Sequence, residues 1–139
     1  MIMRHDDCIF CKIANGEIPS ATIYEDDDFR VFLDLNPATR GHALLVPKDH
    51  FANLLELDEE HAEKAILLAK KIGSRMKEKL DCDGLNLVQN NGEAAGQTVF
   101  HFHMHLIPRY KDDHAGILWE PGKTTPEEME EIKKLVNED

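Results

Sequence analysis

Three histidines occur at alternate positions in one short stretch of this 139-residue chain: His101, His103 and His105. The chain has eight histidines in all, so three within five residues favours a functional cluster over chance placement. Apolar residues alternate with them, and alternation with period two is typical of a half-buried β-strand. We therefore predict a strand over 98–107 that carries the three imidazoles on one face. Its core face would be formed by Phe100, Phe102, Met104 and Leu106.

Two kinds of chemistry come into question for such a cluster. A catalytic zinc held by all three side chains is disfavoured, because His101 and His105 would lie about 13 Å apart along a strand, whereas zinc–nitrogen bonds measure about 2.0–2.1 Å. A neutral imidazole can instead act as a nucleophile without a metal, since its pKa lies near neutrality. Its other ring nitrogen would keep a hydrogen and donate it to a backbone carbonyl. A phosphorus centre suits this site, because phosphoryl transfer depends on positioning and on neutralised oxygens.

The elements that position these residues can be predicted from hydrophobic periodicity and turn residues. Strands are predicted over 21–24 and 29–33, joined by the solvated acidic turn 25–28, and over 42–47 and 85–89. Short helices are predicted over 8–14 and from about Pro126 to Asn137, the latter with an apolar side. The connection 90–96 contains glycines that would let backbone N–H groups approach a ligand. The apolar side of the last helix consists of Met129, Ile132, Leu135 and Val136.

One long helix is predicted from about Asp58 to Leu80, with Asp58 as its N-cap. It should pack across the sheet through a single apolar stripe. We expect His61 to be a solvated helix residue and Cys82, beyond the helix, to be a structural thiol. The stripe consists of Ala62, Ala65, Ile66, Ala69, Ile72, Met76 and Leu80.

Composition limits the classes of partner. With 27 acidic and 16 basic residues, the formal charge is -11, which disfavours a nucleic acid polymer or an anionic membrane as partner. No apolar run approaches the roughly 18 residues of a transmembrane helix, and the first residues do not form a signal peptide. We expect one domain over 1–139 and a cytoplasmic location.

Cys8 and Cys11 form a C-x2-C pair, and the odd total of three cysteines does not suggest a disulfide scaffold. A redox pair would need a βαβ context, which the predicted antiparallel sheet does not supply. Two readings stay open from these residues alone. The thiols are either simply buried or form half of a zinc site, because two thiolates one turn apart can supply two of the four ligands that zinc needs.

The stretch His101-Phe102-His103-Met104-His105-Leu106-Ile107 resembles the histidine triad signature, His-x-His-x-His-x-x with apolar x. The resemblance extends over 8–13, 34–47 and 90–109. It implies an α+β fold, in which a five-stranded antiparallel sheet carries one long helix and short helices lie at both ends, usually as a homodimer. It also implies hydrolases or transferases acting at the α-phosphate of nucleotides.

Within that family the chain is similar to the bacterial hydrolases of the nucleoside phosphoramidase branch. The implied activity is release of a nucleoside monophosphate from phosphoramidates or related purine nucleotide conjugates, through a covalent nucleotidyl-histidine intermediate. A close alternative is hydrolysis of dinucleoside polyphosphates. An alternative of another class is a nucleotide-binding adaptor with vestigial turnover. The implied ligand is a purine nucleotide such as AMP or an AMP conjugate.

The resemblance also assigns roles to residues of this chain. His103 corresponds to the nucleophile, His105 to a phosphate contact and His42 to the fourth histidine of the site, with His101 in the same catalytic group. Asp34 corresponds to the acid that holds the ribose hydroxyls, which suits a carboxylate as an acceptor. Phosphate and leaving-group positions correspond to Asn90, Gly96, Gln97 and Thr98. The apolar slot for the base corresponds to Ile9, Phe10, Ile13, Phe32 and Leu35.

Some bacterial members of the family with this cysteine spacing are similar at four further positions. The resemblance therefore favours a structural zinc held by Cys8, Cys11, His50 and His101, which would tie the N-terminal segment to the sheet. It implies no catalytic metal.

Overall fold

The computed structural model describes residues 4–138 and contains one five-stranded sheet in the order β1-β2-β3-β5-β4. All four strand pairings are antiparallel, which confirms the predicted α+β fold. The strands are β1 Thr22–Glu25, β2 Phe29–Leu33, β3 Ala43–Pro47, β4 Gly84–Val88 and β5 Met104–Arg109. The helices are α1 Ile9–Ala14, α2 Glu59–Leu80 and α3 Pro126–Asn137, with a 3-10 turn η1 Glu93–Ala95.

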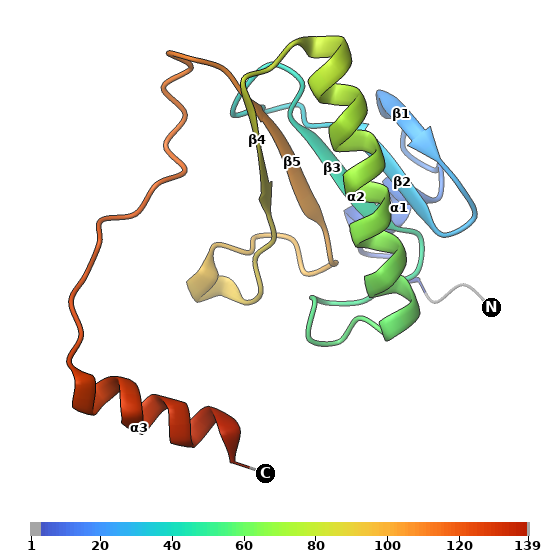
Figure 1. Cartoon of the computed structure of the whole chain (residues 1–139). Coiled ribbons are helices and arrows are strands. Elements are labelled where there is room, and N and C mark those ends of the chain that lie inside the picture. Colours follow the sequence, from blue (N-terminus) through green and yellow to red (C-terminus); the bar gives the residue numbers. More distant parts are fainter. Residues whose placement is uncertain (1–3, 139) are drawn as a thin grey trace.

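The two faces of the sheet are covered by different helices (Figure 1). The helix α2 crosses one side and α1 lies behind the other. Alternate residues of β3 belong to separate apolar clusters: Ala43 and Leu45 to the α2 side, Leu44 and Val46 to the α1 side. Because both of its faces are covered, every residue of β3 is buried. The sheet therefore gives the α1 side a rigid floor.

The long helix begins and ends at the predicted residues. The Asp58 side chain accepts a hydrogen bond from the His61 N–H, and Asp81 ends the helix in the left-handed region at φ 53°. The predicted apolar stripe was wrong at Ile66, which is 52% exposed, while Leu68 is buried. The prediction that His61 is solvated was also wrong. Its ring packs against Phe29 and Phe51, and its Nδ1 bonds to Asp58.

The histidine strand is shorter than predicted, because β5 begins only at Met104. Before it, the Phe102 N–H donates to the carbonyl of Phe51 in a loop, so this part of the chain does not pair with a neighbouring strand. Phe100, predicted to face the core, is 53% exposed. The alternation nevertheless continues through the irregular part, since Phe102 and Leu106 both belong to the α2-side core.

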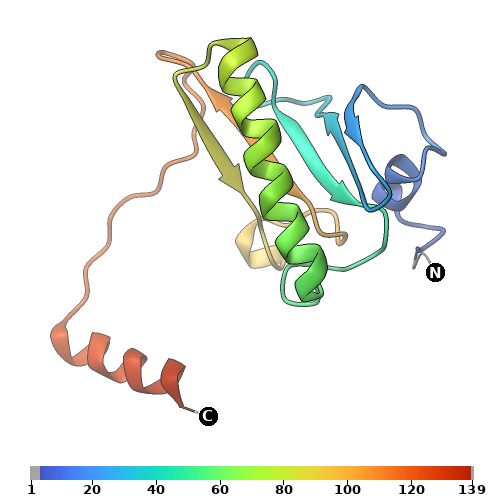
Figure 2. The same cartoon turned by 45° about the vertical axis from the view of Figure 1, so that its right-hand side comes forward.

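Beyond β5 the chain leaves the body as an arm. Residues 110–125 form no helix or strand, and α3 lies well away from the sheet (Figures 1 and 2). The predicted last helix is confirmed over Pro126–Asn137, but none of its residues is buried. Within the described chain, no helix is both long and apolar enough to cross a membrane.

Candidate active site and metal centre

A cavity of about 700 Å³ lies on the α1 side of the sheet. It is closed on one side by α1, on the floor by β2 and β3, and at one end by the connection between β4 and β5. Most residues predicted to bind substrate line it, namely Ile9, Phe10, Ile13, Phe32, Asp34, Leu35, Asn90, Gly96 and Thr98, together with His103 and His105. Among the residues predicted to be catalytic or to bind substrate, three do not line it: His42, His101 and Gln97.

The ring of His103 is held in one tautomer. Its Nδ1–H donates to the carbonyl of His101 at 2.8 Å, which leaves Nε2 with its lone pair. The edge of the ring meets Phe10 at 4.9 Å between centroids, and the residue is only 7% exposed. Burial lowers the pKa of His103 below its usual 6.5. The middle histidine therefore presents a neutral, unprotonated nitrogen at the cavity, as a nucleophile requires.

His42 and His105 form a chain of hydrogen bonds beside it, which we call the relay. The Ala38 N–H donates to Nδ1 of His42, so the hydrogen of His42 is on Nε2. That Nε2–H donates to Nδ1 of His105 at 2.9 Å. The hydrogen of His105 is therefore on its own Nε2, where it can be donated to a ligand. His42 does not line the cavity, but it determines which nitrogen of His105 carries the hydrogen.

Both rings of this chain are electrically neutral. Burial, and then the nearby His103 and His42, lower the pKa of His105 to about 4. Burial likewise lowers the pKa of His42, although Asp34, 3.6 Å away, opposes the shift. Oxygens of a phosphate would thus meet donors that carry no full charge.

The polar residues around the histidines are held by the backbone. One oxygen of Asp34 accepts the Asn36 N–H at 2.8 Å, which leaves its other oxygen toward His42. Gly96 has φ +97°, a conformation that favours glycine. Gln97 is 2% exposed, and its amide group bonds to the backbone of Gly92, Ala52 and Val99. Gln97 shapes the loop instead of facing the cavity.

A second cluster joins Cys8, Cys11, His50 and His101, whose ligand atoms all lie within 4.8 Å of one another. Nδ1 of His101 is 3.4 Å from both sulfurs, and Nδ1 of His50 is 3.4 Å from Cys11. His101 is fully buried, and its Nε2–H donates to the carbonyl of Pro47. His101 was predicted both for the catalytic group and for the metal group, and the structure turns it toward the thiols and away from the cavity.

This cluster has the donor set and spacing for zinc. Tetrahedral ligands with bonds of 2.0–2.3 Å lie roughly 3.3–3.8 Å apart, close to the separations of 3.4 Å observed here. The carbonyl of Pro47 leaves the lone pair of His101 on Nδ1, in the manner of an outer-shell partner of a metal-binding histidine. Burial raises the pKa of the Cys11 thiol to about 11. A bound cation would remove that penalty by stabilising the thiolate.

Asp34, His42 and His105 form another close group of possible ligands. The ring-nitrogen lone pairs of the two histidines are already used, because Nδ1 of His42 accepts a backbone N–H and Nδ1 of His105 accepts from His42. This group is therefore built as a hydrogen-bonded chain and is poorly suited to a cation.

Several cavity residues were not predicted from the sequence. Asn36 is two residues beyond Asp34, and its position after the predicted strand was a usable signal. The others lie in loops or alternate within strands, so they carried no chemical pattern. They are Ile18, Pro19, Ser20, Ala21, Leu33, Leu44 and Val99.

The fold and the site combine an antiparallel sheet with buried, neutral histidines beside a cavity, and comparison with known proteins specifies the family. Residues 15–112 match the HIT domain. SMU.412c from Streptococcus mutans UA159 has a solved structure that is 39% identical, with a TM-score of 0.91, covering 96% of this chain and 85% of that one. The chain belongs to the HIT family.

Two further relatives have informative names. The adenosine 5'-monophosphoramidase HNT1 of Saccharomyces cerevisiae is 39% identical over 129 residues, covering 91% of this chain and 78% of the relative. A zinc-bound histidine triad family protein from Mycobacterium smegmatis has a solved structure that is 38% identical, with a TM-score of 0.76 and 84% coverage of each chain.

Proposed function

We propose that this protein is a nucleotide hydrolase that releases a nucleoside monophosphate from phosphoramidates or related purine nucleotide conjugates. The observation that carries the proposal is the tautomer of His103, whose Nδ1–H bonds to a carbonyl and whose Nε2 is unprotonated beside the cavity. The similarity to an adenosine 5'-monophosphoramidase supports the choice of substrate.

In the proposed first step, Nε2 of His103 attacks the α-phosphorus in line with the leaving group. A phosphorus–nitrogen bond to His103 forms, the bond to the leaving amine breaks, and the amine takes a proton from the solvent as it departs. The Nε2–H of His105 and the loop of Gly96 and Thr98, which border the cavity, would hold the phosphate oxygens. In the second step water attacks the phosphorus and gives up a proton to the solvent, the bond to His103 breaks, and the neutral imidazole is restored.

The remainder of the cavity suits a nucleoside. Phe10 and Phe32 meet edge to face at 6.0 Å, and with Ile9, Ile13 and Leu35 they form an apolar slot for a base. Asp34 lies between this slot and the histidines and would accept hydrogen bonds from ribose hydroxyls. A base in the apolar slot and a phosphate beside the histidines would match the apolar and polar side chains that line the two ends of the cavity.

We also propose that Cys8, Cys11, His50 and His101 hold a structural zinc. The ion would neutralise the thiolates of the buried Cys11 and the partly buried Cys8, and would fix the N-terminal segment, which carries α1, against the sheet. Since α1 closes one wall of the cavity, zinc would support the site from outside without taking part in the reaction.

The experiment that tests the function compares steady-state rates on a panel of substrates. It contains an adenosine phosphoramidate, the guanosine equivalent, and diadenosine tri- and tetraphosphate. We expect the phosphoramidates to give the highest kcat/KM and AMP or GMP as product. A preference for the diadenosine compounds would place the protein in the alternative branch. Binding of AMP without turnover of any member would instead indicate an adaptor.

A further inference from the structure

The α2 side of the sheet carries a groove at its edge. The helix α2 packs mainly against β3, β4 and β5, whereas β1 is the edge strand. One helix is about 10 Å wide and neighbouring strands are about 4.8 Å apart, so α2 cannot cover all five strands. The result is a groove of about 650 Å³ between α2 and β1, which we call the β1 groove.

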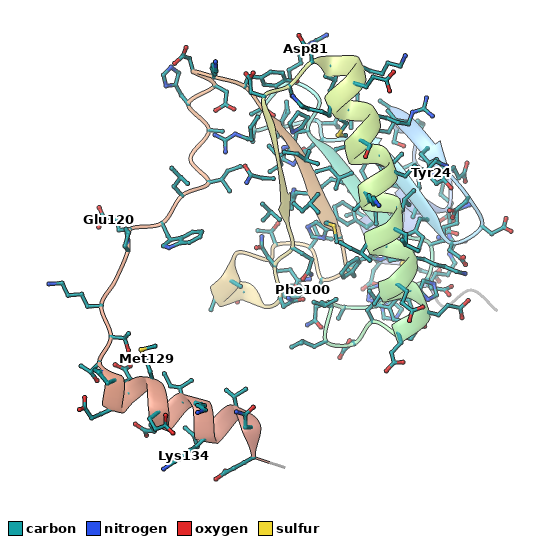
Figure 3. All side chains as sticks on the ribbon, in the orientation of Figure 1. Tyr24, Asp81, Phe100, Glu120, Met129 and Lys134 are labelled. Atoms are coloured by element: carbon teal, nitrogen blue, oxygen red, sulfur yellow. The ribbon has the colours of Figure 1, made fainter. Side chains whose placement is uncertain are left out.

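The edge strand contributes two successive side chains to this groove. The register of β1 against β2 shifts between Thr22 and Tyr24, so one residue is inserted at Ile23. Neighbouring side chains of a regular strand point to opposite faces, and a bulge of this kind re-aims one of them. Ile23 and Tyr24 both line the β1 groove. Figure 3 shows Tyr24 beside α2, in agreement with the position of Lys71 over its ring at 4.7 Å.

The floor of the β1 groove is aliphatic. Ile72 and Met76 of α2 are buried, and Leu80 follows one turn later, so the three side chains form a row about 12 Å long. Ile23 and Leu33 line the groove from the sheet and are still 46% and 38% exposed. An aliphatic ligand along this row would remove the remaining apolar surface from water, which is favourable.

The charges around the groove are all of one sign. Among the described residues, Arg40, Lys71, Arg75 and Lys79 line it, and no acidic residue does. The active-site cavity on the other side of the sheet has the opposite character, since Asp34 lines it and no lysine or arginine does. The whole chain has 27 acidic and 16 basic residues. The β1 groove is therefore a positive region on a negative molecule, and it would attract an anion.

Most of this positive charge is not paired within the chain. Across residues 4–138, none of the ion pairs involves Arg40, Lys71 or Arg75. Lys79 reaches only its neighbour Glu78, at 3.9 Å. Lys71 lies over an aromatic ring, so the two arginines and Lys79 are the cations that a ligand can use.

The backbone brings these three cations to the same end of the groove. Gly41 has φ +91° and approaches α2 so closely that an added Cβ would lie 2.5 Å from the side chain of Leu80. Arg40 precedes Gly41 in the chain, and Lys79 precedes Leu80. Arg75 is one turn before Lys79, on the same side of the helix. An anionic group bound here would have the aliphatic row extending away from it along α2.

We propose that the β1 groove binds a soluble aliphatic phosphate, that is, a molecule with an alkyl or acyl chain that ends in a phosphate group. The chain would lie along the aliphatic row, and the phosphate would lie among Arg40, Arg75 and Lys79. A phosphate monoester carries a charge of about −1.5 to −2 at pH 7, and a guanidinium group can bind two of its oxygens at once. The groove volume falls within the range of about 300–1,000 Å³ that is usual for small-molecule sites. This inference does not depend on the proposed enzymatic function.

The test is calorimetry on the full-length chain with decyl phosphate below its micellar concentration. We expect saturable binding of one molecule per chain. Two probes separate the contributions of chain and charge: inorganic phosphate lacks the aliphatic chain, and decyl maltoside lacks the charge. Each should bind at least about tenfold more weakly than decyl phosphate, because each loses one of the two contributions.

Variants locate the binding in the groove. Arg75→Glu with Lys79→Glu should weaken decyl phosphate binding at least about tenfold, since two attractive charges become repulsive. The matched control is Lys111→Glu with Lys123→Glu, which changes the net charge equally at two exposed lysines outside the groove and should retain the wild-type affinity. Ile23→Ser should weaken binding about fivefold through the aliphatic floor alone. Circular dichroism should show the wild-type helix content in all three variants.

The proposal fails if decyl maltoside binds as tightly as decyl phosphate, or if the groove variant and its control bind alike. It also fails if inorganic phosphate matches decyl phosphate, which would indicate an anion site without a place for the chain. A further arm sediments the protein with phosphatidylglycerol vesicles. We expect the protein to stay in the supernatant, because its net charge is -11. Cosedimentation that is lost in the groove variant would overturn a soluble ligand in favour of a membrane surface.

Discussion

The two histidine clusters are built from neighbouring residues of one segment, yet they are prepared for different chemistry. His101 and His103 are two residues apart, both are buried, and both donate one ring hydrogen to a backbone carbonyl. They donate through opposite nitrogens. His101 uses Nε2 and turns Nδ1 to the thiols, whereas His103 uses Nδ1 and keeps Nε2 for the cavity.

The difference shows that the backbone carbonyl selects the role of an imidazole. Residue type and burial are the same in the two cases, and burial lowers both pKa values. What differs is the acceptor: the carbonyl of Pro47 at the end of β3 for His101, and the carbonyl of His101 itself for His103. Two neighbouring imidazoles can thus offer opposite ring nitrogens, one to the thiols and one to the cavity.

The sharpest test of this division is the variant His103→Ala. We expect turnover of an adenosine phosphoramidate to fall at least about 10³-fold, because no other unprotonated nitrogen faces the phosphorus. Zinc content and AMP affinity should stay at wild-type levels, measured by elemental analysis and calorimetry. His103→Gly should behave likewise. Turnover of the Ala variant at the wild-type rate would remove His103 from the mechanism, and loss of zinc would show that the clusters are coupled.

The reciprocal variant, Cys11→Ser, should act on the metal cluster. We expect zinc to fall from about one equivalent to less than a tenth, and Tm to fall on the order of 10 °C, since binding energy at a structural zinc site is folding energy. kcat should change less than about tenfold. Cys82→Ser is the control for zinc content, because this buried thiol lies outside the cluster. A wild-type protein purified without added metal that contains no zinc would contradict the assignment.

The sequence predicted the elements better than it predicted the roles of the histidines. Helix caps and turn residues are local signals, so the bounds of α2 and α3 were predicted closely. The start of β5 was not, because Phe102 bonds to Phe51, a contact between distant parts of the chain. The relay could not be predicted either. The contact between the Ala38 N–H and Nδ1 of His42, which selects the tautomer of His42, forms only in the folded chain. His61 looked solvated because the aromatic rings around it come from other elements.

Replacement of His42 tests whether a residue outside the cavity lining positions the site. His42→Ala removes the donor that holds Nδ1 of His105, so His105 can take the other tautomer and lose its hydrogen toward phosphate. We expect kcat to fall about 10- to 100-fold with little change in KM, in the range typical of outer-shell partners. His42→Asn keeps an N–H donor and should recover part of the rate. Equal losses in the two variants would indicate that bulk, not the hydrogen bond, is what matters.

The smallest effect concerns pH, and it compares the relay with ordinary histidines. Burial lowers the pKa of His105 to about 4 and those of His42 and His103 below 6.5, so all three stay neutral as the pH falls through 6.5. We expect the acid limb of kcat/KM to lie below pH 6.5. Between about 6.5 and 4 the unfolded chain binds protons that the folded chain does not, so the free energy of unfolding must decrease as the pH falls through this window.

The measurements are a kcat/KM profile and urea denaturation at several pH values. A profile with an acid limb at the ordinary pKa of 6.5 would mean that these histidines are more solvated than their burial in the structure indicates. In His42→Ala the loss of stability on acidification should be smaller, because one buried imidazole has been removed. The control is His61→Ala, a change at a histidine outside both clusters, which should leave the acid limb of kcat/KM in place. If both variants shift that limb equally, the shift cannot be attributed to the relay, and the contrast between the two clusters would rest on the tautomer of His103 alone.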